Sequence, residues 1–357
     1  MSNGSGFSAG GMVRAFRRSN MTAIGMILVA MIAFASLASP YFLGYYNIQA
    51  VIRDLAFIGM IAMAQAMLLI IGELDLSVGA VASLCGILAG MMIVGQGLNP
   101  YLAFVIALGL GALAGTINGL IVSRLRLNSM VVTIGMMGVY GGIGLVLTRG
   151  KAITGIPEEI RFLGNGSIGP IPAPFFFTVA VLMLVLFITR KTRTGRYMYA
   201  IGNSRDAARI LGIKVDAIRV FVFALAGFVS ALAGILYVAR LGSSQTAIGE
   251  AWAINSIASA VIGGVALTGG IGNPAGALIG AAIIAIIQNA IVLFGVNVYW
   301  QSAVSGFVVV TAIALSSLST MWKERKLRRG KVAAVPPDQA VPREPPAADR
   351  VMEGERA

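Results

Sequence analysis

The sequence predicts an all-α, polytopic integral membrane protein, a helical bundle of about ten transmembrane helices. Two observations support this fold class: 57% of the 357 residues are hydrophobic and only 11% are charged, and the apolar residues form long continuous runs. Soluble domains carry about 25% charged residues, so this chain lacks the polar surface that a water-soluble fold of its size exposes. Helices are expected rather than barrel strands because the runs lack a two-residue alternation.

Ten apolar runs come close to the roughly 20 residues that a helix needs to cross a hydrocarbon core of about 30 Å. In chain order they are Met21–Ser39, Leu55–Ile71, Leu76–Val94, Tyr101–Val122, Met130–Leu147, Ala173–Thr189, Val220–Ala239, Trp252–Leu267, Gly276–Phe294 and Val298–Leu318. The first run follows basic residues and ends in a Ser-Leu-Ala that imitates a signal-peptide cleavage site. Its length and the nine runs behind it favour an uncleaved span.

The Lys and Arg residues orient these spans, because loops rich in them stay on the cytoplasmic side. With both termini cytoplasmic, all but five of the 27 Lys and Arg residues lie on that side; the exceptions are Arg53, Arg149, Lys151, Arg161 and Arg240. We therefore expect a basic cytoplasmic segment 1–20, a transmembrane domain 21–322 with a cytoplasmic loop 190–219, and a disordered cytoplasmic tail 323–357. The net charge of +13 suits a membrane surface rather than nucleic acid.

The composition argues against an enzyme. The chain contains no histidine and a single cysteine, Cys85, so it lacks the commonest general base, the commonest metal ligands and any disulfide within the chain. It also contains no G-x-x-x-x-G-K-[ST] phosphate-binding sequence. We expect no metal and no cofactor in this chain, and any ATP hydrolysis that drives it must come from another chain.

Two acids, Glu73 and Asp75, lie between the second and third spans. Buried carboxylates are costly in a membrane unless they are used or paired, so one interpretation places both on a translocation path or at a hinge between helices. In the other, Asp75 or Ser77 caps the next helix and Glu73 sits at an interface that water reaches.

Six amide side chains lie in or at the ends of the predicted spans: Gln65, Asn118, Asn255, Gln288, Asn289 and Gln301. Amides recognise the hydroxyl groups of polar solutes by hydrogen bonding, so these residues are candidates for lining a path. Hydrogen bonds between helices explain them equally well. Trp252 and Trp300, near span ends, are expected to be interfacial anchors.

The loop 190–219 is too long for a simple connector. Its core, GNSRDAARILGI, predicts a short helix that begins near Asp206 and ends near Gly212. Its small residues Ala207 and Ala208 would offer one face that another protein can approach closely. The charges alone equally suit an amphipathic helix lying on anionic lipid.

This core resembles the EAA loop by which the permeases of ABC importers dock on their ATPase, with Asp206 in the place of the usual Glu. Other segments extend the resemblance along most of the membrane portion: GELDLSVG at 72–79, Asn118-Gly119 at the end of a span, FLGNGSIGPIP at 162–172, TGRYMYAIG at 194–202 and AVIGGVALTGGIGNPAGALIGA at 260–281. In this order and spacing they resemble the ribose-type monosaccharide permeases of ABC importers.

The resemblance implies a bacterial inner-membrane permease that pairs with a second copy or a paralogue, between an extracytoplasmic substrate-binding protein and an ATPase with two nucleotide-binding domains. ATP and Mg would belong to that ATPase, and Asp206, Ala207, Ala208 and Gly212 would transmit its motion. The implied cargo is a small polar solute, above all a monosaccharide such as ribose; related permeases move nucleosides, branched-chain amino acids or signalling sugars. An ion-coupled secondary transporter is the alternative class, with the two acids above as its only relay groups.

The chain departs from the pattern of this family in three segments. Glu73 stands where a second glycine is usual, Asn203 and Arg205 stand where Gly and Glu are common, and Ser129-Met130 replaces a frequent Pro-Phe. None of these changes breaks the expected architecture, but they leave the substrate subclass open.

Overall fold

The computed structural model describes residues 20–297, 299–308, 310–311 and 314, and all of these except Ala314 belong to one compact unit. The predicted basic segment 1–20, apart from its last residue, and the predicted tail 323–357 lie outside the described residues. Eight helices in the described part are long and apolar enough to cross a membrane. The all-α membrane fold is therefore confirmed, while the count of ten spans and the sidedness of the termini stay predictions.

The eight long apolar helices include one that changes from α to π geometry. They are α2 (Asn20–Ala38), α3 (Tyr45–Ile70), α4 (Val78–Gly90) continued by the π-helical η1 (Met91–Gly95), α5 (Pro100–Arg124), α6 (Ser129–Thr148), α8 (Ala173–Lys191), α11 (Val215–Leu241) and α13 (Pro274–Leu293). Much of the tenth predicted span, Val298–Leu318, lies outside the described residues, but 300–308 are helical.

Shorter elements connect the long helices. The helices among them are α7 (Glu158–Asn165), α9 (Arg193–Asn203), α10 (Arg205–Ile210) and α12 (Trp252–Ile262). Two-residue strands pair antiparallel, β1 (Ile153–Thr154) with β4 (Ser243–Ser244) and β2 (Ser167–Ile168) with β3 (Ile171–Pro172).

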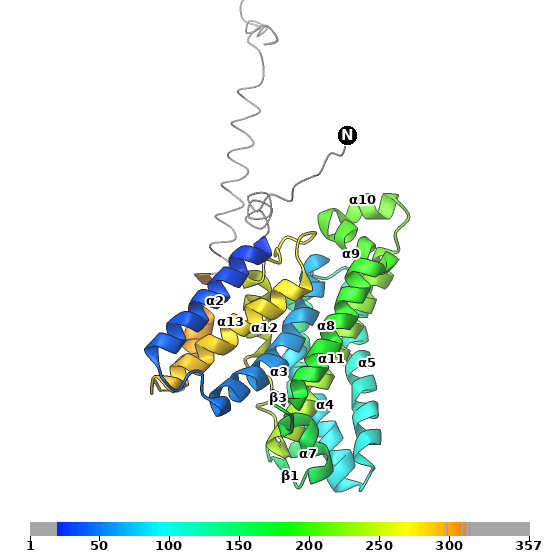
Figure 1. Ribbon diagram of the computed structural model, residues 1–357. Coiled ribbons are helices and arrows are strands. Elements are labelled where there is room, and N and C mark those ends of the chain that lie inside the picture. Colours follow the sequence, from blue (N-terminus) through cyan, green and yellow to red (C-terminus); the bar gives the residue numbers. More distant parts are fainter. Residues whose placement is uncertain (1–19, 298, 309, 312–313, 315–357) are drawn as a thin grey trace, which may run out of the picture. The chain divides into compact units, whose positions relative to one another are not determined.

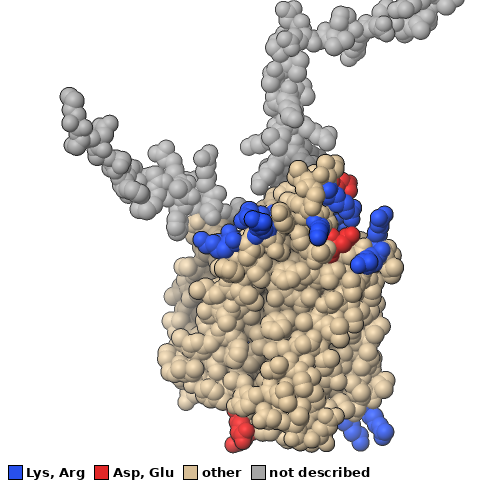
Figure 2. All heavy atoms as spheres, turned by 90° about the vertical axis from the view of Figure 1, so that its right-hand side faces the viewer, with Lys and Arg blue, Asp and Glu red and all other residues tan. Residues whose placement is uncertain are grey.

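The helices form a bundle with different connections at its two ends. α9 and α10 lie at one end, and α7 lies with the short strands at the other (Figure 1). Every residue of α3 from Ala56 to Ile70 is buried, as expected of a central helix that is apolar on all sides. On the face shown in Figure 2, Lys and Arg gather at the α9–α10 end above a broad band free of charge. This distribution agrees with a cytoplasmic α9–α10 end.

Several helix starts follow directly from the local sequence. Asn99, Asn128 and Asn273 each accept hydrogen bonds from backbone N–H groups in the first turn of α5, α6 and α13. Prolines follow two of these caps, at a helical position where no N–H is needed. α3 begins ten residues before the predicted span, so that Arg53 and Asp54 belong to a helix and not to a loop.

The eighth predicted span, Trp252–Leu267, is wrong as a full helix. Its helix α12 has only 11 residues, which rise about 16 Å, roughly half of a hydrocarbon core. The preceding segment 244–251 is non-helical and lies along α4 between Gly86 and Gly79. Irregular backbone at such a depth is tolerated only where protein or a water-filled cavity surrounds it.

The segment 244–251 is held against α4. Ser244 Oγ donates a hydrogen bond to the carbonyl of Gly86 at 2.9 Å. In the first turn of α4, Gly79 lies so close to the backbone of Gly249 that a Cβ atom on Gly79 would overlap it. Backbones approach this closely only where side chains are absent, so Gly79 fixes the position of the segment.

Gly79→Ala is expected to lower the melting temperature of the detergent-purified protein by about 2 °C or more. Alanine is the better helix former by about 1 kcal/mol, but here its methyl group displaces Gly249. The matched control is Gly109→Ala in α5, where the added methyl group meets open space and the melting temperature should stay equal or rise. Equal responses of the two variants in a thermal unfolding assay would contradict the close packing.

Candidate functional site

The acids predicted from the sequence lie in the turn 72–77, which joins α3 to α4. Asp75 is 1% exposed. Its Oδ1 accepts hydrogen bonds from the backbone N–H of Ser77 at 2.8 Å and from the Ser77 hydroxyl at 2.6 Å. Ser77 directly precedes the first residue of α4, and no side chain caps that helix by a hydrogen bond. The carboxylate instead closes a local turn that orders the residue before α4.

Two of the six amides, Gln65 and Asn118, surround the same turn and are fully buried. Asn118 donates to the Ser77 hydroxyl at 2.8 Å and accepts from the Tyr140 hydroxyl at 3.0 Å. With its amide oriented so that both ends are satisfied, Gln65 donates to the carbonyl of Asp75 at 3.2 Å and accepts from its N–H at 3.3 Å. These two amides join α3, α5 and α6 to the turn, which agrees with their interpretation as contacts between helices.

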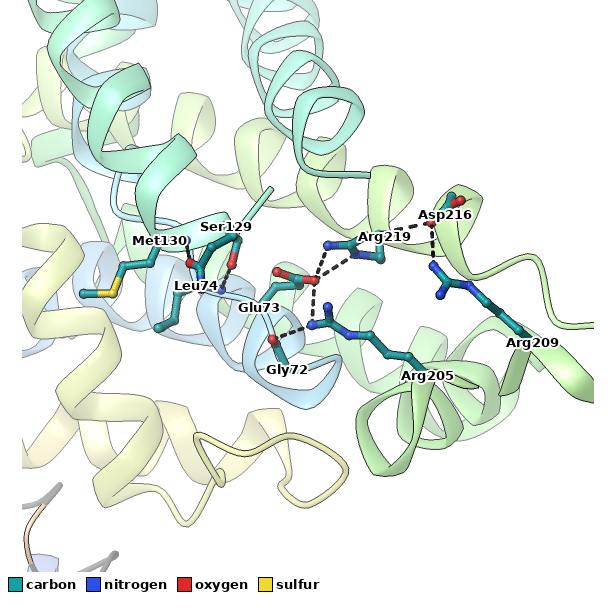
Figure 3. A network of polar contacts seen from close by, with 10 residues as sticks. Gly72, Glu73, Leu74, Ser129, Met130, Arg205, Arg209, Asp216 and Arg219 are labelled. Carbon is teal, nitrogen blue, oxygen red and sulfur yellow. Dashed lines mark hydrogen bonds and ion pairs between the residues drawn. The ribbon is translucent and has the colours of Figure 1, made fainter. Parts of the chain in front are cut away.

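Glu73 is 3% exposed, so the expected water-exposed interface is wrong. Arg205 of α10 and Arg219 of α11 reach the Glu73 carboxylate from neighbouring elements (Figure 3). Its Oε1 lies 2.6 Å from Arg219 Nη2 and 2.8 Å from Arg205 Nη2, and Arg205 also donates to the carbonyl of Gly72 at 2.9 Å. Breaking a buried ion pair by removing one partner costs about 3–5 kcal/mol, so Glu73 holds both helices to the turn.

Hydroxyl groups of α6 complete the bonding of the turn. The N–H of Leu74 donates to Ser129 Oγ at 3.1 Å, and the N–H of Leu76 donates to Thr133 Oγ1 at 3.1 Å. Unpaired backbone groups are costly away from water. The interruption between α3 and α4 therefore persists because six helices, α3 to α6 together with α10 and α11, supply its hydrogen-bond partners.

The short helix predicted in the cytoplasmic loop is present as α10. Ser204 caps it by accepting a hydrogen bond from the N–H of Ala207 at 3.3 Å. Gly212 has a φ of +77°, a left-handed conformation that favours glycine and reverses the chain after the helix. The helix and its glycine stop are as the sequence predicts.

The two alanines of α10 face different sides. Ala207 and Asp206 are exposed, but Ala208 is 2% exposed and packs into the bundle. The expectation that both alanines share one outer face is therefore wrong, because consecutive helical residues point about 100° apart. The apolar outer surface comes instead from Ile210 and Leu211, which are 86% and 76% exposed.

α9 attaches this region to the end of α3. The Tyr199 hydroxyl donates to the carbonyl of Gly272 at 2.9 Å. Burial raises the pKa of this phenol, so it stays a hydrogen-bond donor at neutral pH. The backbone of Gly202 lies directly against Ile70 and Gly270, whose carbonyl and N–H are hydrogen-bonded to each other at 2.9 Å.

The remaining four amides line one cavity, called here the amide cavity, of about 490 Å³. Asn255 comes from α12, Gln288 and Asn289 from α13, and Gln301 from the helical residues 300–308. The irregular residues 247–251 also contribute to the lining. The volume lies within the roughly 300–1,000 Å³ of small-molecule sites.

Asn255 gives the amide cavity an unused hydrogen-bond acceptor. The residue is 3% exposed, and its Oδ1 has no hydrogen-bond partner in the part of the chain that the structure describes. Buried polar groups are almost always bonded, and leaving one unpaired costs about 1–3 kcal/mol. This oxygen has almost no accessible surface of its own, so a hydroxyl or N–H donor in the cavity pairs with it only if the amide turns toward the cavity.

Sequence patterns did not identify the two acids that line this cavity, Asp54 and Glu250. Asp54 falls one residue before the predicted span; it pairs with Arg240 at 2.7 Å, whose guanidinium lies 5.5 Å from the ring centroid of Phe57. Trp252, expected as an interfacial anchor, is instead 9% exposed and stacked on Phe57. The adjacent charged residues Arg53 and Asp54, at the start of an otherwise apolar run, are the sequence signal that could have identified Asp54.

Comparison with known proteins identifies the family of this membrane-spanning chain. Residues 47–313 match the family described as branched-chain amino acid transport system / permease component. The chain belongs to this family.

Individual relatives align along most of the chain. The ribose import permease protein of Bacillus subtilis (strain 168) is 37% identical over 290 residues, which cover 81% of this chain and 90% of that protein. The ribose import permease protein of Escherichia coli (strain K12) is 34% identical over 294 residues, covering 81% and 91%. The autoinducer 2 import system permease protein of Yersinia enterocolitica serotype O:8 / biotype 1B (strain NCTC 13174 / 8081) is 31% identical over 326 residues, covering 89% and 90%. The resemblance to ribose-type ABC permeases is confirmed, and the chain is a multi-pass permease component rather than an enzyme.

The departures from the permease pattern gather around the turn 72–77. Glu73 pairs with Arg205 at 2.8 Å. The hydroxyl of Ser129 accepts a hydrogen bond from the backbone N–H of Leu74, the residue after Glu73. Asn203 lies against Gly270, which is bonded to the last residue of α3. None of the five departing residues, Met130 included, is among those that line the amide cavity, and one pair of them, Glu73 and Arg205, joins α10 to the turn.

Asp75→Asn is expected to leave uptake by the permease and its melting temperature nearly unchanged, because an amide oxygen can still accept from Ser77. Asp75→Ala removes that acceptor and leaves two buried donors unpaired, which costs about 1–3 kcal/mol each, so its melting temperature should fall. Loss of uptake in a well-folded Asp75→Asn protein would show that the negative charge itself is required.

Proposed function

We propose that this chain is the membrane subunit of an inner-membrane ABC importer that carries a monosaccharide such as ribose inward, and that the amide cavity lies on its path. The observation that carries the proposal is the unpartnered Asn255 oxygen in a cavity that three further amides line. Sugars offer hydroxyl donors to such oxygens and hydroxyl acceptors to the amide NH2 groups. The names of the relatives, ribose import permease and autoinducer 2 import system permease, support the same solute class.

The charges of the cavity favour a neutral solute over an amino acid, the solute class in the family description. Asp54 and Glu250 contribute carboxylates to the lining, and no Lys or Arg is among its described residues. Asp54 is already paired with Arg240 at 2.7 Å, so the described lining offers the carboxylate of an amino acid no free cation, and Glu250 would repel it. Nucleosides and signalling sugars also carry hydroxyl groups and are the second candidates. Membership of the permease family sets the ion-coupled secondary transporter aside.

The partners in this proposal are an ATPase with two nucleotide-binding domains, which carries ATP and Mg, an extracytoplasmic substrate-binding protein, and a second permease copy or paralogue. The apolar residues exposed on and after α10, Ile210 and Leu211, support contact with the ATPase, since exposed apolar side chains at a cytoplasmic end are typical of a protein interface. Nucleotide binding there would bias the bundle between outward-open and inward-open states.

Reconstituted in vesicles with its ATPase and binding protein, the chain is expected to accumulate ribose, and it should not do so when the ATPase is left out. Ala207→Trp places a large side chain on the exposed face of α10 and should reduce both ATPase co-purification and uptake by about tenfold or more, because interface cores are closely packed. Ala152→Trp, an exposed alanine at the opposite end of the bundle, is the control for ATPase co-purification. Accumulation without the ATPase, or normal uptake by Ala207→Trp, would contradict the proposal.

Asn255→Ala is expected to raise the ribose concentration for half-maximal uptake by about three- to tenfold, the factor that the loss of one hydrogen bond gives. Basal ATP hydrolysis should not change, since the residue is remote from α10. Gln96→Ala removes an exposed amide outside the cavity and should leave the uptake curve as it is. Superimposable curves for Asn255→Ala and the unmodified chain would remove the amide cavity from the path.

A further inference from the structure

We propose that Arg205 is a positioning residue that transmits the displacement of α10 to the α3–α4 turn through Glu73, and from there to the wall of the amide cavity. The inference rests on the proposed function, because it names the contact through which ATP hydrolysis in the partner would reach the solute.

Arg205 connects α10 to the turn 72–77 by two contacts of one guanidinium nitrogen. One nitrogen, Nη2, lies 2.8 Å from Glu73 Oε1 and 2.9 Å from the carbonyl oxygen of Gly72. The guanidinium therefore holds a side chain and the backbone of the same turn (Figure 3). Because Arg205 is the first residue of α10, any rotation or translation of that helix pulls on these two contacts.

Charge compensation alone does not account for this second arginine. Arg219 is 2.6 Å from Glu73 and 5% exposed at its side chain. Its contact with the half-exposed Asp216 is longer, at 3.8 Å, so its positive charge mainly compensates the buried carboxylate. Arg205 is 41% exposed at its side chain, so its charge would stay solvated if it turned outward. Its contribution is the connection of α10 to the turn.

The other ion pairs of α10 are weaker connections. Arg209 lies 3.8 Å from Asp206 within the helix and 3.6 Å from Asp216 of α11, and all three side chains are about half exposed or more. Exposed pairs of this kind contribute little, because solvent screens them and long side chains lose freedom on pairing. Arg209 therefore offers a matched control: the same side chain on the same helix, without contact to Glu73.

Contacts continue from the turn to the amide cavity. Asp75, two residues after Glu73, orders Ser77 at the start of α4. Gly79 in the first turn of α4 abuts the backbone of Gly249, which lines the cavity. Closely packed elements do not deform continuously, so a displaced turn shifts the position of this wall.

The first test uses the purified permease alone and depends on neither ATP nor sugar. Hydrogen exchange is measured for Arg205→Gln, Arg205→Lys and Arg209→Gln. Arg205→Gln should exchange about two- to tenfold faster in both 72–77 and 245–251, the factor expected for the loss of one hydrogen-bonded contact. Arg205→Lys, which retains a cation able to reach Glu73, and Arg209→Gln should exchange like the unmodified chain. Unchanged exchange at 245–251 in Arg205→Gln would overturn the proposal.

The second test measures sugar molecules imported per ATP hydrolysed by the complete reconstituted transporter. Arg205→Gln should still assemble with the ATPase and hydrolyse ATP, but its ratio should fall by about fivefold or more, as for the loss of an allosteric coupling. Arg205→Lys should restore most of it, and Arg209→Gln should not change it. A normal ratio of sugar imported to ATP hydrolysed in Arg205→Gln overturns the proposed role of Arg205 and leaves the proposed function intact. Failure of the unmodified transporter to import ribose overturns the proposed function, and hydrogen exchange then decides the link.

Discussion

A helix that stops inside a membrane protein must satisfy its free backbone groups without water. Between α3 and α4, side chains from other helices satisfy these groups, and the same contacts join those helices to the turn. The turn obtains its partners from Gln65, Ser129 and Thr133 and from the carboxylate of Asp75. The partners come from α3 and α6 or from the turn itself. The interruption is therefore the point at which the helices of the bundle are joined by polar contacts.

The sequence predicts the spans well because a continuous apolar run of about 20 residues has one stable form in lipid. Prediction of the spans from hydropathy fails where a segment inside the bundle is polar or non-helical. Residues 244–251 include Gln245, Thr246 and Glu250, so hydropathy places them in a loop, although they lie along α4. The early start of α3 is missed for the same reason: Arg53 and Asp54 suggest a loop, because two of the groups that they bind, the Asn165 carbonyl and Arg240, lie more than 100 residues away.

The candidate site shows the same division. The cytoplasmic helix and its glycine stop depend on neighbours in the sequence, and local patterns predict them. The grouping of the amides depends on tertiary structure: Gln65 and Asn118 join helices, and Asn255, Gln288 and Gln301 line one cavity. Asn289 does both, because its amide also pairs with that of Asn47 in α3. The sequence shows Glu73 and Arg205 as two separate departures from a family pattern. Only the fold shows that they are partners.

The irregular segment 244–251, together with α12, also decides the direction of α13. It advances along α4 from Gly86, which Ser244 contacts, to Gly79, which Gly249 contacts, and it does so through turns rather than a helix. With this crossing, α11 and α13 run parallel, and the connection 263–273 returns to the end where α9 lies, as the contact between Gly202 and Gly270 requires. If only the long apolar helices were counted, α11 and α13 would be successive spans, and α13 would be assigned the opposite direction across the membrane.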